Sequence, residues 1–325
     1  MKSKKFLSVI MCFALIACML PYASLSAFAD DEIHTSADGN WKYRILDDNT
    51  AEIYGGEETL AYYGNEIAIN IPGHIDGVTV TQIGDFAFSG LEIININAGI
   101  RQISSLAFAM CSELTQINVD SNNSYFCSVN GILFDKNMEL LICYPAGKTD
   151  SSYTIPSGVQ NIGMYSFFAC IYLSEITLSD TVKDIGLMSF GACASLSVVN
   201  MTSALSDIEE YAFYGCESLT ELAIPASTTV GDYAFADSGL TTIKGYWDTE
   251  AERFANDNGY AFVSLDILGD IDYDGSVTLD DYAVIKTHLI DDTLNFKKVA
   301  DYNTDGAIDA FDLFYIDLAV NQQDA

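Results

Sequence analysis

The chain has 325 residues, of which 50% are hydrophobic, and 46 acidic residues against 14 basic ones give a formal net charge of −32. So acidic a surface repels nucleic acids and anionic membranes, which argues against both as partners and favours divalent cations or basic protein surfaces. After residue 20, no apolar stretch approaches the roughly 20 residues that a membrane-spanning helix needs.

The first 29 residues have the layout of a secretory signal peptide. Lysines near the N-terminus precede an apolar run over residues 6–20, and Ala-Phe-Ala at residues 27–29 is a suitable cleavage motif. We therefore expect cleavage after Ala29 and a secreted, extracellular protein. The alternative is a lipoprotein signal, because Leu-Ile-Ala-Cys at residues 15–18 resembles a lipobox.

Residues 30–80 contain short runs of β type, among them WKYRI and IAINIPG, and are expected to form an N-terminal cap. The repeats that follow need such a cap, because the open end of a stack of repeats would expose its core.

A pattern I-G-x-x-A-F recurs from residue 83 onward, and its phenylalanines set the period. Phe167, Phe190, Phe213 and Phe235 are 23, 23 and 22 residues apart. Leucine and isoleucine fill fixed positions after each phenylalanine, as in CESLTELAI at residues 216–224. A period of about 20 to 29 residues with this pattern is typical of leucine-rich repeats, whose coils cover one another's apolar faces. The L-x-x-I-x-I segments alternate as half-buried strands do, which predicts one parallel sheet along the stack.

The combined motif IGxxAFxxCxxLxxI resembles the bacterial BspA-like leucine-rich repeats over about residues 75–264. The resemblance implies a β-rich leucine-rich-repeat solenoid with a parallel β-sheet, which we expect over residues 81–264. It also implies a role in contacts with other macromolecules rather than in catalysis.

Residues 120–158 interrupt the period and account for the 59 residues between Phe108 and Phe167. Their sequence predicts a hairpin insertion, with one strand ending at Phe134, a turn at residues 135–137 and a second strand ending at Tyr144. The hairpin tip is a candidate contact site, although a flap packed on the coils is the favoured interpretation.

Four cysteines occupy the same position of successive repeats: Cys111, Cys170, Cys193 and Cys216. Stacked side chains of adjacent coils point the same way, which is poor disulfide geometry, so buried thiols are favoured over disulfides. Cys127 and Cys143 lie outside this repeated position, and whether these two form a disulfide bond stays open.

The solenoid is expected to close with a helix and a strand. TEAERFANDNGYAF at residues 249–262 predicts an amphipathic helix with Ala251, Phe254 and Ala255 on one side and Gly259 at its end. The closing strand, AFVSL, runs into the next segment without a linker rich in proline and threonine. We therefore expect the C-terminal module to sit close to the solenoid end.

The last 60 residues crowd aspartates into two loops of twelve residues, which begin at Asp270 and Asp301 and carry glycine at position 6. This spacing is that of a calcium-binding loop, in which oxygen ligands wrap a hard cation and glycine permits the sharp turn. Position 7 contributes a main-chain carbonyl, and position 9 acts through water. The sequence therefore predicts two calcium ions. The expected ligands are Asp270, Asp272, Asp274, Ser276, Thr278 and Asp281 in the first loop, and Asp301, Asn303, Asp305, Ala307, Asp309 and Asp312 in the second.

Each loop precedes an apolar-periodic helix, no helix enters the first loop, and position 12 is aspartate in both. This duplicated loop–helix unit over residues 266–325 resembles a type I dockerin. The resemblance implies a small all-α module that folds with calcium and binds a cohesin module on a scaffoldin, in a cellulosome or a similar cell-surface assembly. The residues that the resemblance places against the cohesin are Leu279, Asp280, Lys286 and Thr287, and Ala310, Phe311, Asp317 and Leu318.

The two halves of this module differ from each other, and both lack the Ser-Thr pair that is common at positions 10 and 11. Interchangeable docking through either half is therefore doubtful. The type of cohesin, and whether one or both halves bind it, stay open.

No catalytic site is predicted. The three histidines, His34, His74 and His288, are scattered along the chain, which argues against a zinc site or a Ser-His-Asp triad. We expect a secreted non-catalytic component that docks through the dockerin and presents the solenoid to a protein or glycan, in the context of polysaccharide degradation. The alternative is a polysaccharide-degrading glycoside hydrolase with an unrecognised active site in the solenoid, because so acidic a chain offers many carboxylate pairs.

Overall fold

The computed structural model describes residues 32–55, 60–267, 269–270, 277–291, 300–301, 308 and 310–323. The chain divides into two compact units, one of Met1–Leu222 with Thr228–Leu240, the other of Ala223–Ser227 with Thr241–Ala325. The predicted signal peptide and its cleavage site lie outside the described residues.

Short strands build the first unit. In chain order they are β1 (His34–Thr35), β2 (Lys42–Ile45), β3 (Ala51–Ile53), β4 (Ala68–Asn70), β5 (His74–Ile75), β6 (Val78–Ile83), β7 (Ile93–Ile96), β8 (Gln102–Ile103), β9 (Gln116–Val119), β10 (Phe126–Val129), β11 (Ile132–Asp135), β12 (Leu140–Cys143), β13 (Ser152–Thr154), β14 (Asn161–Ile162), β15 (Glu175–Thr177), β16 (Asp184–Ile185), β17 (Val198–Asn200), β18 (Asp207–Ile208), β19 (Glu221–Ala223) and β20 (Thr229–Val230).

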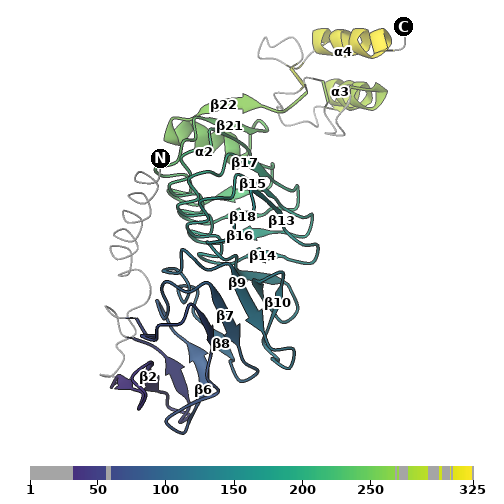
Figure 1. Ribbon diagram of the computed structural model, residues 1–325. Coiled ribbons are helices and arrows are strands. Elements are labelled where there is room, and N and C mark those ends of the chain that lie inside the picture. The colour runs from purple at the N-terminus through teal and green to yellow at the C-terminus, as the bar shows by residue number, and fades with distance from the viewer. Residues whose placement is uncertain are drawn as a thin grey trace. The chain divides into compact units, whose positions relative to one another are not determined.

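The coils of the first unit follow one another at the predicted period. Strands β14, β16, β18 and β20 pair in parallel, and Ile162, Ile185, Ile208 and Val230 are aligned across them. The short strands β14, β16 and β18 lie one above another in Figure 1. The β-solenoid predicted from the repeat is confirmed and has about 9 turns.

The phenylalanines of the repeat stack through the interior of the solenoid. The ring centroids of Phe167 and Phe190 are 4.9 Å apart, those of Phe190 and Phe213 are 5.1 Å apart, and those of Phe213 and Phe235 are 5.6 Å apart. All four side chains are fully buried. Offset stacking of this kind adds to the hydrophobic gain of burial, so each ring binds its coil to the next.

The glycine of the motif is required where one coil passes close to the previous one. A Cβ atom on Gly186 would lie 2.8 Å from the carbonyl oxygen of Ile162 in the preceding coil, and the Gly186 N–H donates to that same oxygen. A side chain here would force the two coils apart.

The prediction of one parallel sheet along the whole stack is wrong. The longer strands form separate sheets, β4-β7-β9, β13-β15-β17 and one that begins with β19, so β9 does not pair with β13 and β17 does not pair with β19. Residues 120–151 separate β9 from β13 in the chain, and strands β10 and β11 within them contact β9. The opposite side of the solenoid is likewise divided, into a sheet that contains β6 and β8 and the sheet β10-β11-β12-β14-β16-β18-β20.

The predicted hairpin is confirmed and has one strand more than expected. Strands β11 and β12 are antiparallel, β10 pairs with β11 through a turn at Asn130 and Gly131, and β12 continues in parallel into β14. Leu133 and Phe134 are fully buried, so the insertion is packed into the core.

At the N-terminal end, β1, β2 and β3 form an antiparallel sheet, and β3 pairs in parallel with β6. Trp41 and Tyr43 are buried there against the same core as the first coils. These strands cover the apolar end of the stack, as a cap must.

The six described cysteines are all free thiols. The stacking argument predicted this for the four cysteines of the repeat, and the structure also leaves Cys127 and Cys143 unbonded to each other. The thiols of Cys193 and Cys216 donate to the carbonyl oxygens of Phe167 and Phe190, at 3.0 Å and 3.2 Å. Burial raises the pKa of Cys143 to about 12, because a thiolate loses its hydration in the apolar core. The thiols of Cys193 and Cys216 therefore act as small buried side chains that each donate a hydrogen bond to the preceding coil.

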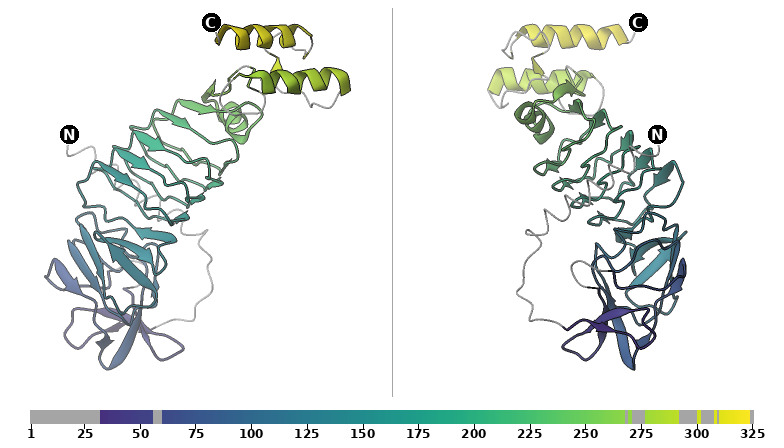
Figure 2. Two further views of the ribbon diagram at one scale, coloured as in Figure 1. Left: turned by 90° about the vertical axis from the view of Figure 1, so that its right-hand side faces the viewer. Right: turned by 60° about the vertical axis from the view of Figure 1, so that its left-hand side comes forward.

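The second unit begins with β21 (Thr242–Gly245), α2 (Glu250–Asn258) and β22 (Ala261–Ser264), and continues into α3 (Leu279–Asp291) and α4 (Ala310–Gln323). The predicted amphipathic helix is confirmed: α2 buries Ala251, Phe254 and Ala255, and Gly259 ends it in the left-handed conformation. Strands β21 and β22 pair in parallel. Figure 2 shows α3 and α4 packed side by side.

Candidate functional site

The structure describes only residues near the two ends of each predicted calcium loop. Asp270, Thr278 and Asp281 of the first loop and Asp301 and Asp312 of the second have described positions. The other predicted ligands lie outside the described residues: Asp272, Asp274, Ser276, Asn303, Asp305, Ala307 and Asp309. Among the described residues no three His, Cys, Asp or Glu side chains form a group that could hold a metal.

The carboxylates at loop positions 1 and 12 are buried. Asp270 and Asp301 are 5% and 7% exposed, and Asp281 and Asp312 are fully buried. Burying a carboxylate costs several kcal/mol unless hydrogen bonds or a counter-charge compensate, and a bound cation is one such counter-charge. Carboxylate oxygens are the ligands that calcium prefers, so the buried residues fit the ion that the spacing predicts.

Asp281 illustrates how helix α3 positions a ligand. The helix begins at Leu279, and Thr278 immediately before it donates its backbone N–H to Asp281 Oδ2 at 2.8 Å. The Thr278 hydroxyl accepts from the Asp280 N–H at 3.2 Å. These bonds satisfy backbone donors at the start of the helix and fix the position of the Asp281 carboxylate, whereas the neighbouring Asp280 is exposed.

The two halves of the module share one small core. Val277, Ile285, Ala300 and Ile316 are buried together, and Ile308 and Leu313 pack against them. Val277 and Ile308 occupy position 8 of their loops, and Ile285 and Ile316 lie four residues after position 12. The same positions of both repeats therefore meet in one core.

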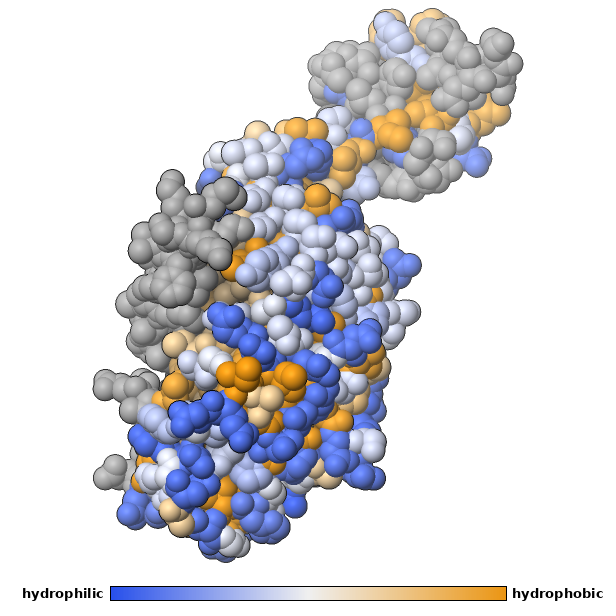
Figure 3. All heavy atoms as spheres, viewed as in Figure 1, coloured by the Kyte–Doolittle hydropathy of each residue, from blue (hydrophilic) through white to orange (hydrophobic). Residues whose placement is uncertain are grey.

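The residues expected to face a partner lie on the surface of this module. Leu279 is 62% exposed and Phe311 is 65% exposed. Asp280, Lys286, Thr287, Ala310 and Asp317 are exposed as well, whereas the side chain of Leu318 lies outside the described residues. In Figure 3 apolar side chains are visible among the C-terminal helices, and the solenoid face shown carries apolar patches among hydrophilic side chains.

The sequence reasoning missed two aromatic residues on α4. Phe314 is 59% and Tyr315 is 41% exposed, and their ring centroids are 5.6 Å apart. The equivalent positions of α3 hold Ala283 and Val284, so only α4 presents aromatic rings here. The helical period could have identified both residues, because they fall between the buried positions of Asp312 and Ile316.

Trp247 connects the end of β21 to the C-terminal module. Its side chain packs against the core of Val277, Ile285, Ala300 and Ile316. Its backbone N–H donates to Asp266 Oδ2 at 2.6 Å, and the Ser264 hydroxyl donates to the same oxygen at 2.9 Å. The segment between β22 and the first calcium loop is therefore held against the strand pair.

The solenoid carries a row of large side chains on left-handed backbone. Phe86, Tyr165, Met188, Tyr211 and Tyr233 occupy the same position of five coils, each with φ between 50° and 58°. The rings of Tyr211 and Tyr233 stack at 5.4 Å, and Tyr233 is 64% exposed. A left-handed backbone is costly for such residues, and the repetition of the turn in each coil maintains it.

Comparisons with known proteins agree with both parts of the chain. The family model of the BspA type leucine rich repeat region matches residues 64–134 and 146–256 with 6 copies. The type I dockerin domain matches residues 268–321. A search of curated proteins found no match. Among the described residues, no helix has the length and apolar character needed to cross a membrane.

Several solved structures are similar to the chain. The pneumococcal vaccine antigen PcpA is 18% identical, with 73% of this chain and 99% of that chain covered at a TM-score of 0.45. A leucine rich cell surface protein from Faecalibacterium prausnitzii is 20% identical, with 74% and 97% covered at a TM-score of 0.46. A leucine-rich repeat protein from Bacteroides capillosus is 28% identical, with 37% and 98% covered at a TM-score of 0.35. The chain belongs to the BspA-type leucine-rich repeat proteins and carries a C-terminal type I dockerin domain.

Proposed function

We propose that this protein is a secreted, non-catalytic component that docks through its dockerin onto a cohesin module of a scaffoldin and presents its solenoid to a protein or glycan. Both domain types are typical of extracellular proteins, and both families are non-catalytic. The observation that carries the docking proposal is the exposure of Leu279 and Phe311, because a soluble module has no reason of stability to hold such side chains in water. The setting is a cellulosome or a similar assembly for polysaccharide degradation.

Calcium is the proposed cofactor, as it is for type I dockerin domains in general. We propose two ions, one for each loop, held by the twelve ligands predicted above. The module carries 14 aspartates against three lysines. Bound cations neutralise these carboxylates, so the small apolar core suffices to hold α3 and α4 together. The buried carboxylates of Asp281 and Asp312 support this proposal.

The proposed cohesin contact is unequal between the two halves of the dockerin. Helix α4 presents Phe311, Phe314 and Tyr315, whereas the corresponding positions of α3 are Asp280, Ala283 and Val284. Large aromatic side chains are enriched among the residues that dominate binding energy at interfaces. We therefore propose that the face of α4 makes the main contact and that Leu279 of α3 lies toward its margin.

The proposed domain boundaries follow the sequence: a signal peptide at residues 1–29, a cap at 30–80, the solenoid at 81–264 with its insertion at 120–158, and the dockerin at 266–325. The packing of Trp247 on the dockerin core supports a dockerin that stays close to the last strands of the solenoid.

The proposal is tested by titrating the full mature protein against a panel of cohesin modules, in calcium and in excess EDTA. We expect at least one cohesin to bind in calcium and none in EDTA. Phe311→Ala should weaken that binding roughly 30-fold, as loss of a dominant interface residue does. Tyr172→Ala, which removes a 48% exposed aromatic side chain of the solenoid, is the matched control and should leave the affinity unchanged. Binding that persists in EDTA, or equal effects of the two variants, would contradict the proposal.

A further inference from the structure

The free edge of strand β8 in the solenoid faces an open groove. Strand β8 pairs with β6 on one side and with no strand on the other in the described part of the chain. The next strand of that side of the stack, β14, pairs with β12 of the insertion. The parallel ladder therefore stops at β8 and begins again at β12.

Where the ladder stops at β8, the coil presents the backbone carbonyl groups that in the regular coils accept hydrogen bonds from the next coil. In the regular coils, Lys183 N–H donates to Gln160 O at 2.7 Å and Gly186 N–H donates to Ile162 O at 2.9 Å. The corresponding carbonyls of the β8 coil are those of Arg101 and Ile103. No backbone N–H of the described residues donates to either, because Gly163 N–H is bonded to Leu141 O instead. The carbonyl oxygens of Arg101 and Ile103 therefore form two acceptors on the free edge of β8, spaced as they would be for a parallel strand.

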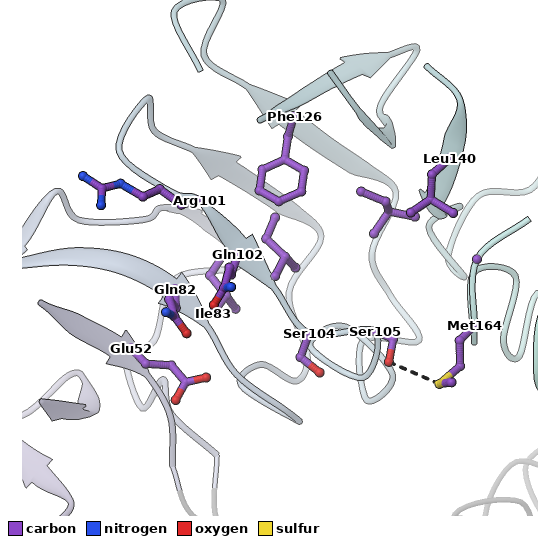
Figure 4. Close-up of a pocket in the computed structure, with 13 residues that line it drawn as sticks. Glu52, Gln82, Ile83, Arg101, Gln102, Ser104, Ser105, Phe126, Leu140 and Met164 are labelled. Atoms are coloured by element: carbon purple, nitrogen blue, oxygen red, sulfur yellow. Dashed lines mark hydrogen bonds between the residues drawn. The ribbon is translucent and has the colours of Figure 1, made fainter. Parts of the chain in front are cut away.

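A cavity of about 640 Å³ lies at this edge, within the range of ligand-binding pockets. Its apolar part is formed by Ile83, Ile103, Phe126, Leu140, Ile142 and Met164. In Figure 4, Gln82, Gln102 and Ser104 lie on one side of the cavity, and Leu140 and Met164 lie on the other. Ser105 Oγ and Met164 Sδ approach to 3.6 Å across its end.

We propose that this groove, named here the β8 groove, binds an extended segment of a partner protein, which adds a parallel strand to the edge of β8. The inference rests on the proposed role of the solenoid as a binding surface and names the class of its ligand. The two unused carbonyls require N–H donors two or three residues apart along an extended chain, which a peptide strand supplies. The net charge of −32 disfavours an acidic segment.

The alternation of the two strands beside the groove gives the expected side-chain pattern of the ligand. Ile83 is buried and Ile103 packs against the core, whereas Gln102 is exposed. A strand added in register places its inward side chains in line with Ile83 and Ile103 and its outward side chains in line with Gln102. The segment therefore carries an apolar residue toward Phe126 and Ile142 and a polar residue beside Gln102.

The chain itself provides a probe for this edge. Residues 181–187, TVKDIGL, form the strand that adds to β14 in the regular stack, where their N–H groups meet the equivalent carbonyls. We would titrate a fluorescent heptapeptide of this sequence, with blocked ends, against the full mature protein in calcium and follow its anisotropy. Saturable binding is expected. A peptide with sarcosine at the glycine, which lacks the N–H for Ile103 O, should bind threefold to tenfold more weakly.

Two protein variants locate the binding. Ser105→Trp fills the end of the groove from an exposed position and should weaken binding at least tenfold. Ser112→Trp adds the same ring at an exposed serine that does not line the groove, and should change binding less than twofold. Both variants should bind calcium and cohesin as the parent does, so failure of dockerin docking and failure of the groove are separately visible.

The proposal is overturned if the heptapeptide shows no saturable binding at millimolar concentration, or if Ser105→Trp and the sarcosine peptide have no effect. It is also overturned if xylohexaose or cellohexaose binds instead and Ser105→Trp abolishes that binding, because the groove would then be a glycan site.

Discussion

Replacing Phe190 by alanine tests whether the stacked rings hold the solenoid together. The Phe190 side chain is fully buried between the rings of Phe167, at 4.9 Å, and Phe213, at 5.1 Å. The substitution removes the ring and leaves a cavity between two neighbours, each of which is fixed by its own coil. Such a cavity cannot collapse readily, because closing it would require the coils to shift against their backbone hydrogen bonds.

Burial and stacking give the expected size of the effect. A buried phenylalanine changed to alanine costs about 3 to 5 kcal/mol. Two aromatic pairs are lost as well, each worth about 0.5 to 1.5 kcal/mol beyond the burial. We therefore expect Phe190→Ala to lower the free energy of unfolding by about 5 kcal/mol, near the upper end of the range for one core substitution. Because each coil contacts only its neighbours, we also expect unfolding to split into two transitions, one for the coils on each side of the cavity.

The measurement is a urea titration followed by the fluorescence of Trp41, in a Trp247→Phe background, at constant calcium. Trp41 belongs to the first unit and is 9% exposed, so it reports unfolding of the N-terminal part of the stack. Tyr233→Ala is the matched control, because it also removes a stacked ring, at 5.4 Å from Tyr211, but from a side chain that is 64% exposed. The control should cost less than about 1 kcal/mol. A loss below about 2 kcal/mol for Phe190→Ala, or equal losses for both variants, would refute the reasoning.

Three further predictions concern the thiols and the dockerin. Burial raises the pKa of Cys143 to about 12 from its ordinary value of 9.0, so above pH 9 the unfolded thiol loses its proton while the native thiol keeps it. Native stability should therefore fall as the pH rises from about 9 toward 12, and less so in Cys143→Ala, as urea titrations at pH 8 and 10.5 would measure. Asp281→Asn should weaken calcium binding at least tenfold by calorimetry, whereas Asp280→Asn at the exposed neighbouring position should change it less than twofold; equal effects would argue against Asp281 as a ligand. Calcium should change the fluorescence of Trp247, which packs on the dockerin core, so Trp41→Phe should retain the signal and Trp247→Phe should lose it.

The sequence predicted those features that depend on a period or on a fixed spacing. Phe167, Phe190, Phe213 and Phe235 recur at the length of one coil, so their stacking follows from the repeat alone. The free thiols follow from the same argument, because cysteines in one position of each coil must point the same way. Helix α2 was predictable because its apolar residues keep a helical period and Gly259 ends it.

The error about the sheet arose in part where the period breaks. Insertion of β10, β11 and β12 separates β9 from β13, and nothing in the repeat unit shows how the interrupted ladder rejoins. The division between β17 and β19 falls within the regular period, and the repeat unit does not show it either. The exposure of Phe314 and Tyr315 was likewise missed, because a two-helix module buries only part of each helix and the choice depends on which faces meet.

By itself, the amino-acid sequence determined the solenoid, its period and the family to which each part belongs, and its duplicated aspartate spacing predicted two calcium loops. Only the tertiary structure decided that Leu133 and Phe134 of the insertion enter the core, that Trp247 packs on the dockerin core, and that the carbonyls of Arg101 and Ile103 face an open groove. The physical reason is that local spacing specifies which residues share a face of one coil, whereas an edge or a groove exists only once distant segments have paired with other partners.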